Sequence, residues 1–388
     1  MSWTPVWTWA EVDLGALARN VQLLKDRLPG HCRFMAAVKA DGYGHGLVDV
    51  ARAAVQAGAD ELAVSQLEEG VRLREAGVRV PILALTPPHP SQADHAARHR
   101  IAVPVFQASW LREMRSGRRT SEPLEVHIKM DTGMGRIGLR TREELAAMEP
   151  WLRQPGVVVA GVYTHLATAN QADGTYYRRQ LDRFAEMRQW LAEEGWPDVP
   201  AHCGNSAAAI QYPQDAAEGM AMIRVGAALY GIDTCDEEVR EQTALRLEPT
   251  LALYSTVVQT KLVRAGEYVG YDCSYRAERD EWIGTVPLGY ADGYARDYAG
   301  FHLLVNGRRA PILGRVCMDQ LMIRLPGPCA VGTVVTAIGR SGDDEITLGQ
   351  LAEHSGTIPQ HVLTMLAGRV PRVSAGQPAG RASLRAMP

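Results

Sequence analysis

Apolar residues along this chain follow two different spacings. Over the first 230 residues, short runs of apolar and β-branched residues alternate with longer stretches in which apolar residues recur every three or four positions. The runs predict eight strands, near residues 33–38, 61–64, 81–85, 101–104, 124–130, 157–163, 200–203 and 221–225. The stretches between them predict helices at about 46–57, 66–76, 107–116, 142–153 and 174–194. This alternation indicates an N-terminal (β/α)8 barrel.

Beyond about residue 240 the pattern is that of an all-β domain. Residues 250–264 alternate apolar with polar side chains, and glycine and proline recur through the sequence that follows. The fold class is therefore α/β plus β. We expect the barrel over residues 8–240 and a mainly β domain over 241–373, which residues 1–12 join as a strand. The Gly-, Ala-, Ser- and Arg-rich residues 374–388 are expected to be a disordered tail.

Composition narrows the class of protein. The 388 residues include 41 basic and 44 acidic side chains with no basic block, which argues against nucleic-acid binding. No apolar stretch reaches 18 residues and the N-terminus has no leader pattern, so we expect no membrane contact and a cytoplasmic location. The six cysteines are widely scattered and form no Cys-x-x-Cys pair, which fits a reducing compartment and argues against a disulfide framework or a zinc ribbon.

One lysine stands where a strand meets a glycine-rich loop. The run from Phe34 to Val38 leads directly into Lys39, and glycines follow at positions 42, 44 and 46. A lysine at such a point is able to form a Schiff base with an aldehyde cofactor, because burial lowers its pKa. A solvated lysine is the plainer alternative for this residue considered alone.

Other polar residues follow the later strands, whose ends form the active-site face of such barrels. They are Lys129 and Arg136 after the fifth strand, His165 after the sixth, Ser206 after the seventh, and Arg224 with Gly226 and Ala227 at the eighth. Loops after strands seven and eight commonly bind phosphate. A lysine after the first strand and a phosphate-binding region after strands seven and eight together predict a pyridoxal phosphate (PLP) site. For His165, a core position and a ring stacked on a cofactor both remain open, whereas no partner stands at metal-ligand spacing.

Residues 133–138 also match the G-x-G-x-x-G pattern of dinucleotide-binding loops. That pattern should open a βαβ unit and be followed about 20 residues later by an acid that ends a second strand. Here it follows the fifth strand and contains Arg136. We therefore do not interpret it as a dinucleotide site.

Taken together, these segments resemble the alanine racemases, PLP enzymes of fold-type III. The similar segments run in the same order over nearly the whole chain: residues 37–46, 129–138, 163–165, 202–206, 224–226, 287–293, 314–320 and 369–372. The resemblance implies a homodimer with shared active sites that interconverts L- and D-alanine for peptidoglycan synthesis.

The resemblance also implies a role for each matching position. Lys39 would bind PLP covalently and serve as one base, and Tyr275, reaching the second subunit, would be the other. Arg224 would face the pyridine nitrogen and His165 the ring. The phosphate would be bound by Tyr43, Ser206, Gly226 and Ala227. Arg136, Tyr290 and Met318 would lie near the substrate carboxylate, with Lys129, His202 and Asp319 in support, Lys129 as a carbamate in some members.

The reaction explains these residue types. Moving a proton from one face of Cα to the other requires a base on each side. At the position that the resemblance implies, Arg224 would leave the pyridine nitrogen unprotonated, because arginine stays charged at any working pH. A weaker electron sink limits side reactions and suits a racemase. It argues against a decarboxylase of similar architecture, where a glutamate takes this position.

Some positions depart from the family pattern. Gly368 replaces a phosphate-binding tyrosine, Asn170 replaces an acid at the substrate entrance, and Asp272 and Cys273 replace small neutral residues before Tyr275. These changes leave open a broader amino-acid racemase, acting for example on serine. A non-catalytic PLP-binding protein is a third alternative, but proteins of that kind resemble the barrel alone.

Overall fold

The structure is a computed structural model that describes residues 6–375. Two compact units make up the chain. Within the described residues, one comprises Gly15–Gly42 and Leu47–Glu248, and the other comprises residues 6–14, Tyr43–Gly46 and residues 249–375. Most of the expected tail, from residue 376 on, lies outside the described residues.

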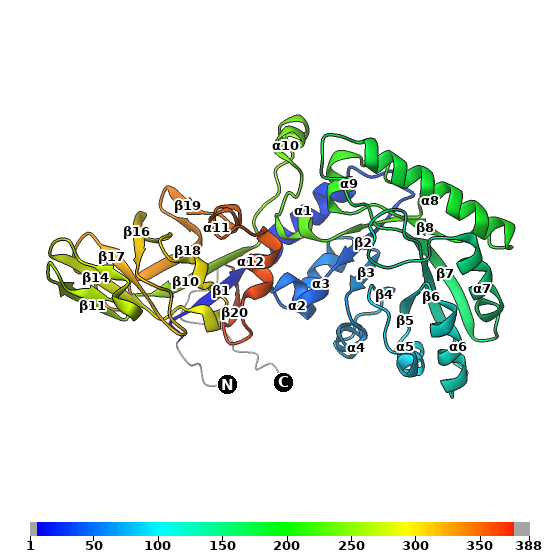
Figure 1. The fold of residues 1–388 in the computed structure, drawn as a ribbon, viewed down its shortest axis with the longest axis horizontal. Helices are drawn as coiled ribbons and strands as arrows, with labels where there is room; N and C mark the ends of the chain where they lie inside the picture. Colours follow the sequence, from blue (N-terminus) through cyan, green and yellow to red (C-terminus); the bar gives the residue numbers. More distant parts are fainter. Residues whose placement is uncertain (1–5, 376–388) are drawn as a thin grey trace. The chain divides into compact units, whose positions relative to one another are not determined.

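The first unit is a parallel eight-stranded sheet with helices outside it (Figure 1). Neighbouring strands follow the order β8-β7-β6-β5-β4-β3-β2-β9. The amide of Ala221 donates to the carbonyl of Ala201 at 2.8 Å, and that of Arg224 to Gly204 at 3.1 Å, which joins β9 to β8 and closes the barrel. The strands are β2 (Arg33–Ala37), β3 (Glu61–Val64), β4 (Ile82–Ala84), β5 (Ile101–Val105), β6 (Leu124–Lys129), β7 (Val157–Tyr163), β8 (Ala201–His202) and β9 (Met222–Val225). The predicted barrel is confirmed.

Helices cover the outer face of the barrel strands. They are α1 (Leu14–Lys25), α3 (Leu47–Gln56), α4 (Leu67–Glu75), α5 (Ala93–Arg98), α6 (Ala108–Gly117), α7 (Arg142–Leu152), α8 (Thr175–Glu193) and α9 (Ser206–Gln211). Helix α10 (Glu237–Thr243) packs against α9. Helix α8 buries Tyr177, Phe184, Met187 and Leu191 on one face, as its apolar spacing requires. Helix α7 begins at a capping box: Thr141 accepts from the amide of Glu144, whose carboxylate accepts from the amide of Thr141.

The second unit is built on a largely antiparallel sheet in the order β11-β14-β17-β16-β15-β18-β10-β1-β20. Its strands are β1 (Trp9–Val12), β10 (Leu251–Thr256), β11 (Gln259–Val263), β14 (Glu281–Val286), β15 (His302–Val305), β16 (Arg308–Leu313), β17 (Leu321–Leu325), β18 (Val334–Ser341) and β20 (Arg372–Ser374). Strand β1 pairs antiparallel with β10 and parallel with β20. Also in this unit are β12 (Tyr268–Val269), β13 (Tyr275–Arg276), β19 (Asp344–Ile346), α11 (Leu348–His354) and α12 (Pro359–Met365). Within residues 6–375, no helix has the length and apolar character that crossing a membrane requires.

Candidate active site

Lys39 opens a left-handed turn two residues after β2 ends. The turn, α2 (Lys39–Tyr43), has φ angles of 54° at Ala40, 53° at Asp41 and 63° at Gly42. This conformation costs an L-residue about 1–2 kcal/mol. The Asp41 carboxylate supports it by accepting a hydrogen bond from the amide of Leu47 at 3.2 Å. Because strain of this kind is retained mainly at functional sites, the turn marks Lys39 as a functional candidate.

The surroundings of Lys39 favour its neutral amine. Burial lowers the pKa of Lys39, the positive charges of Arg136 and Arg224 lower it further, and Glu69 partly opposes them. A larger share of the amine is therefore unprotonated at neutral pH than in a free lysine, which is what a nucleophile requires.

Arg224, buried in β9, connects the loops that follow β7 and β8. Its Nη1 donates to Nδ1 of His202 at 2.8 Å and to the carbonyl of the same residue at 3.3 Å. Its Nη2 donates to the carbonyl of Thr164 at 2.8 Å, and to Nδ1 of His165 and the carbonyl of Cys203, both at 3.3 Å. These bonds fix the plane of the guanidinium group, and the structure brings Arg224, His165 and His202 together.

A second histidine continues this contact inside the barrel. Because Arg224 only donates, Nδ1 of His202 accepts, and its Nε2–H donates to Nδ1 of His127 at 2.9 Å. Burial lowers the pKa of His127 to about 3, so this ring stays neutral. Sequence reasoning missed His127. It lies two residues before Lys129 on β6, and strand alternation places both on one face, which is the signal that identifies it.

Lys129 is a buried amine without a hydrogen-bond partner. Its side chain is 3% exposed, and within the described part of the chain Nζ has no acceptor. The nitrogen lies 4.7 Å from the centre of the Tyr163 ring. Burial and the charges of Arg224 and Arg136 lower the pKa of Lys129 well below its usual value. The surroundings thus favour the neutral form of an amine whose hydrogen-bonding capacity is unfilled within the described residues.

The loops after β8 and β9 meet at Ser206. Its Oγ accepts from the amide of Gly226 at 2.9 Å and from that of Ala228 at 3.3 Å. Ser206 begins α9, where Asn205 Oδ1 accepts from the amide of Ala208 at 3.0 Å. The structure therefore brings together Ser206 and the Gly226–Ala227 backbone predicted to bind phosphate.

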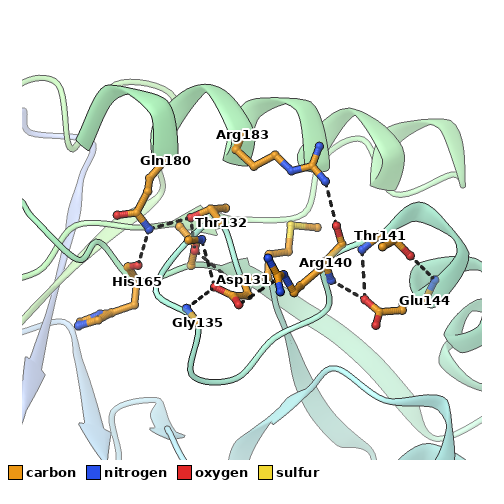
Figure 2. A network of polar contacts seen from close by, with 12 residues as sticks. Asp131, Thr132, Gly135, Arg140, Thr141, Glu144, His165, Gln180 and Arg183 are labelled. Atoms are coloured by element: carbon orange, nitrogen blue, oxygen red, sulfur yellow. Dashed lines mark hydrogen bonds and ion pairs between the residues drawn. The ribbon is translucent and has the colours of Figure 1, made fainter. Parts of the chain in front are cut away.

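The loop after β6 is folded around one buried carboxylate (Figure 2). Asp131 Oδ1 accepts from the amides of Gly133 and Gly135 at 3.1 and 2.9 Å, and Oδ2 lies 3.8 Å from Nε of Arg140. Arg136, in the middle of this loop between β6 and α7, is exposed. Its charge lowers the pKa of both Lys39 and His165, so it acts on the same site.

Two tyrosines of the β unit have different surroundings. The Tyr275 hydroxyl donates to Oε1 of Glu281 and accepts from Nη2 of Arg324 at 2.6 Å. Partial burial and the bond to Glu281 raise the pKa of Tyr275, against the opposing effect of Arg324. Tyr271 is 69% exposed. The hydroxyl of Tyr275, the residue predicted to be a base, thus already takes part in two hydrogen bonds.

The remaining predicted residues lie in or beside this unit. The amide of Tyr290 donates to the carbonyl of Cys317 at 3.0 Å, which brings Tyr290 next to the segment that carries exposed Met318. Asp319 accepts from Nη2 of Arg369 at 2.7 Å. Burial raises the pKa of Tyr43 to about 12.

Among the unusual positions, Asp272 is exposed and pairs with Arg315 at 2.7 Å. The carbonyl of Asn170 accepts from the amide of Asp236 at 2.9 Å. At Gly368, an added Cβ would meet no atom within 4 Å.

Comparisons with known proteins agree over nearly the whole chain. The family models of the alanine racemase N-terminal and C-terminal domains match residues 12–234 and 250–374. The alanine racemase of Geobacillus stearothermophilus is 44% identical over 369 residues, covering 94% of this chain and 93% of that one. Alanine racemase 1 of Bacillus subtilis is 39% identical, covering 94% and 92%.

Solved structures give the same result. The alanine racemase from Bacillus anthracis, with bound L-Ala-P, matches with a TM-score of 0.91 at 41% identity and covers 96% of each chain. A histidine racemase from Leuconostoc mesenteroides matches with a TM-score of 0.85 at 30% identity, covering 95% of this chain and 98% of that one.

Proposed function

This chain belongs to the alanine racemase family, and from that premise we propose that it interconverts L- and D-alanine with pyridoxal phosphate bound at Lys39. The observation that carries the proposal is the arrangement around Lys39. An amine with a lowered pKa shares its surroundings with Arg224, and Ser206 meets the Gly226 backbone at the ends of the later strands.

The residues present fit this cofactor. A phosphate monoester and a substrate carboxylate are both anionic, and Arg136 and Arg224 supply positive charge to the surroundings of Lys39. Ser206, Gly226, Ala227 and Tyr43 would hold the phosphate, and Lys39 would hold the aldehyde carbon. Arg224, which only donates hydrogen bonds, would face the pyridine nitrogen and keep it unprotonated.

When bound, the cofactor makes the Cα proton of an amino acid acidic by delocalising the electron pair left on Cα. The protein's part is to move that proton. Lys39, whose lowered pKa favours the neutral amine, would accept it on one face. Arg136, with Tyr290 and Met318, would bind the substrate carboxylate. His165, kept uncharged by burial and by Arg224, would lie against the ring.

For the second base we propose a tyrosine from residues 271–275 of a second copy of this chain. The surroundings favour Tyr271 over the Tyr275 expected from the sequence. A base needs a hydroxyl that reaches substrate and a pKa lowered towards neutral. Tyr275 is bound to Glu281, which raises its pKa, whereas Tyr271 is exposed. Tyr275 then supports the loop on which Tyr271 lies.

Lys129 is proposed to be a carbamate. The neutral amine is the form that reacts with carbon dioxide, and Nζ lies buried with no acceptor within residues 6–375. A carbamate would introduce an acceptor and a negative charge among Arg136 and Arg224, supported by His202. Carbon-13 NMR after growth in labelled bicarbonate should show a carbamate signal that Lys129→Ala lacks.

The biological setting is part of the proposal. D-alanine is required for peptidoglycan, and a homodimer follows from a base supplied by a second copy. A cytoplasmic location fits the six cysteines, none of which forms a disulfide.

A broader substrate range is the second candidate. A protein of similar fold and 30% identity is named a histidine racemase, so this architecture accommodates a side chain larger than a methyl group. Gly368 leaves open space where the family often has a tyrosine. Initial rates with L-alanine, L-serine and L-histidine would separate the candidates: rates on a larger substrate equal to those on alanine would contradict a narrow alanine racemase.

The central test uses the cofactor-loaded protein. We expect it to convert L-alanine to D-alanine, and Lys39→Ala to lose both this activity and the visible absorbance of covalently bound cofactor after dialysis. Retained absorbance in Lys39→Ala would overturn the assignment of Lys39.

A further inference from the structure

A buried glutamine on helix α8 joins two of the loops that carry the site. Gln180 is fully buried, and its side chain makes three hydrogen bonds to segments outside its helix, of which Figure 2 shows those to Thr132 and His165. Nε2 donates to Oγ1 of Thr132 and to the carbonyl of His165, both at 3.1 Å. Oε1 accepts from the amide of Ala167 at 2.8 Å. The first contact reaches the loop after β6, and the other two reach the loop after β7.

The hydrogen bond at Thr132 is the first of a chain that leads through Thr164 to Arg224. The Thr164 hydroxyl donates to the carbonyl of Met130 at 2.9 Å, so the Thr132 hydroxyl donates to Thr164 Oγ1 at 2.8 Å. The carbonyl of Thr164 accepts from Arg224 at 2.8 Å. The hydroxyls of Thr132 and Thr164 each donate one hydrogen bond and accept another, and the Gln180 amide is the first donor of this chain. Its amide therefore acts on the backbone that holds Arg224 as well as on the loop that leads to Arg136.

Only a carboxamide satisfies this position. The amide of Ala167 requires an acceptor, whereas the carbonyl of His165 and the hydroxyl of Thr132 require donors. An ionised carboxylate of the same size would keep the acceptor but present a lone pair to the carbonyl of His165. A thioether would satisfy neither requirement and would leave buried polar groups unpaired.

Helix α8 also contacts the same loop through close packing. The Tyr176 hydroxyl donates to the carbonyl of Gly133 at 2.8 Å. An added Cβ at Gly133 would fall 2.4 Å from that hydroxyl oxygen and 3.5 Å from Cγ of Gln180. The loop therefore lies directly on the helix, and a change at Gln180 moves the loop rather than filling empty space.

We propose that Gln180 is a positioning residue that sets the loop carrying Arg136 against the loop carrying His165, and so places the substrate carboxylate relative to the cofactor ring. The inference rests on the proposed function, because it assigns Arg136 to substrate and His165 to the ring. Gln180 touches neither and acts through Thr132 and the backbone of residues 165–167.

The test compares Gln180→Glu and Gln180→Met with Gln189→Glu and Gln189→Met, matched changes at an exposed position of the same helix. In the loaded enzyme we expect both Gln180 variants to raise KM for alanine and lower kcat, with a fall of roughly 10- to 100-fold in kcat/KM. The absorbance maximum of the bound cofactor should also shift. The Gln189 variants should match the parent protein.

Hydrogen exchange of the cofactor-free protein gives a second readout. In Gln180→Met we expect faster exchange in peptides from both loops, residues 131–139 and 164–170. Thr132→Val removes the hydroxyl's bonds to Gln180 and Thr164, keeps the side chain's size and leaves the other two bonds of Gln180 in place. It should change exchange in the two loops in the same direction by a smaller factor. It serves as the milder variant if Gln180→Met does not fold.

Separate results decide the inference and the proposed function. Gln180 and Thr132 variants with lowered melting temperature but unchanged KM, kcat and absorbance would show a merely structural role and overturn the inference. Faster exchange confined to residues 164–170 would also overturn it. A parent protein that does not racemise alanine would instead contradict the proposed function, whereas the exchange data would still test whether Gln180 couples the loops.

Discussion

Replacing Tyr275 and Tyr271 one at a time distinguishes a structural role from a chemical role for these two tyrosines of the second unit. Tyr275→Phe removes a hydroxyl that donates to Glu281 and accepts from Arg324, and hydrogen bonds to charged groups contribute about 1.5–3 kcal/mol each. Glu281 and Arg324 remain paired at 2.6 Å, so part of this loss is recovered. We expect Tyr275→Phe to lower the free energy of unfolding by about 1.5–3 kcal/mol in total.

Tyr271→Phe should behave in the opposite way. The side chain is 69% exposed, so its removal should change the free energy of unfolding by less than about 0.5 kcal/mol. As the proposed second base, however, its loss should suppress exchange of the Cα proton from one enantiomer of alanine far more than from the other. Tyr275→Phe should leave the ratio of the two exchange rates close to that of the parent protein.

Two measurements decide between the tyrosines. Urea unfolding gives the stability of each variant, and deuterium incorporation at Cα, started separately from L- and D-alanine, gives the two exchange rates. One-sided loss of exchange in Tyr275→Phe, with normal exchange in Tyr271→Phe, would refute the structural reasoning and restore the assignment made from the sequence. Equal loss from both enantiomers in Tyr271→Phe would contradict a two-base mechanism.

Three further predictions concern single groups. The pKa of His127 is about 3 in the folded protein against 6.5 ordinarily, so between these two pH values the unfolded chain binds the extra proton and the free energy of unfolding falls as the pH drops. The slope of the free energy of unfolding against pH should therefore be shallower in His127→Gln, and an unchanged slope would contradict the lowered pKa of His127. Because the pKa of Lys39 is lowered, covalent cofactor uptake should reach half its maximal rate below pH 10.5; a midpoint at or above that pH would contradict the lowering. The exposed Asp272–Arg315 pair should contribute less than about 1 kcal/mol to the free energy of unfolding, so Asp272→Asn should lower that free energy only slightly, and not at all in 1 M salt. A larger decrease that persists in salt would show that solvent does not screen the pair.

The barrel was predictable because its strands are buried on both faces and therefore appear as short continuous apolar runs. The five predicted helices each end within one residue of α3, α4, α6, α7 and α8. Helix α5 is only six residues long, too short for an apolar period to be visible. Helix α1 was not predicted, although it has Leu17, Val21 and Leu24 at helical spacing. It precedes the first barrel strand and therefore lies outside the strand–helix alternation that predicted the other helices.

The site was predictable where it depends on strand ends, because parallel strands bring their carboxyl ends to one face. That rule leads to Lys129, His165, Ser206 and Arg224 without knowledge of the loops. It does not show which hydrogen bond each side chain makes. The partners of Tyr275 come from β14 and β17, the latter 49 residues along the chain, and such pairings depend on sheet register rather than local sequence.

The left-handed turn after Lys39 has a stereochemical consequence. For a D-residue the signs of the favoured φ and ψ angles are reversed, so the values of 54° at Ala40 and 53° at Asp41, which strain an L-residue, are relaxed for its mirror image. In a chain assembled by chemical synthesis, D-alanine at position 40 should therefore stabilise the fold, whereas L-valine there should destabilise it.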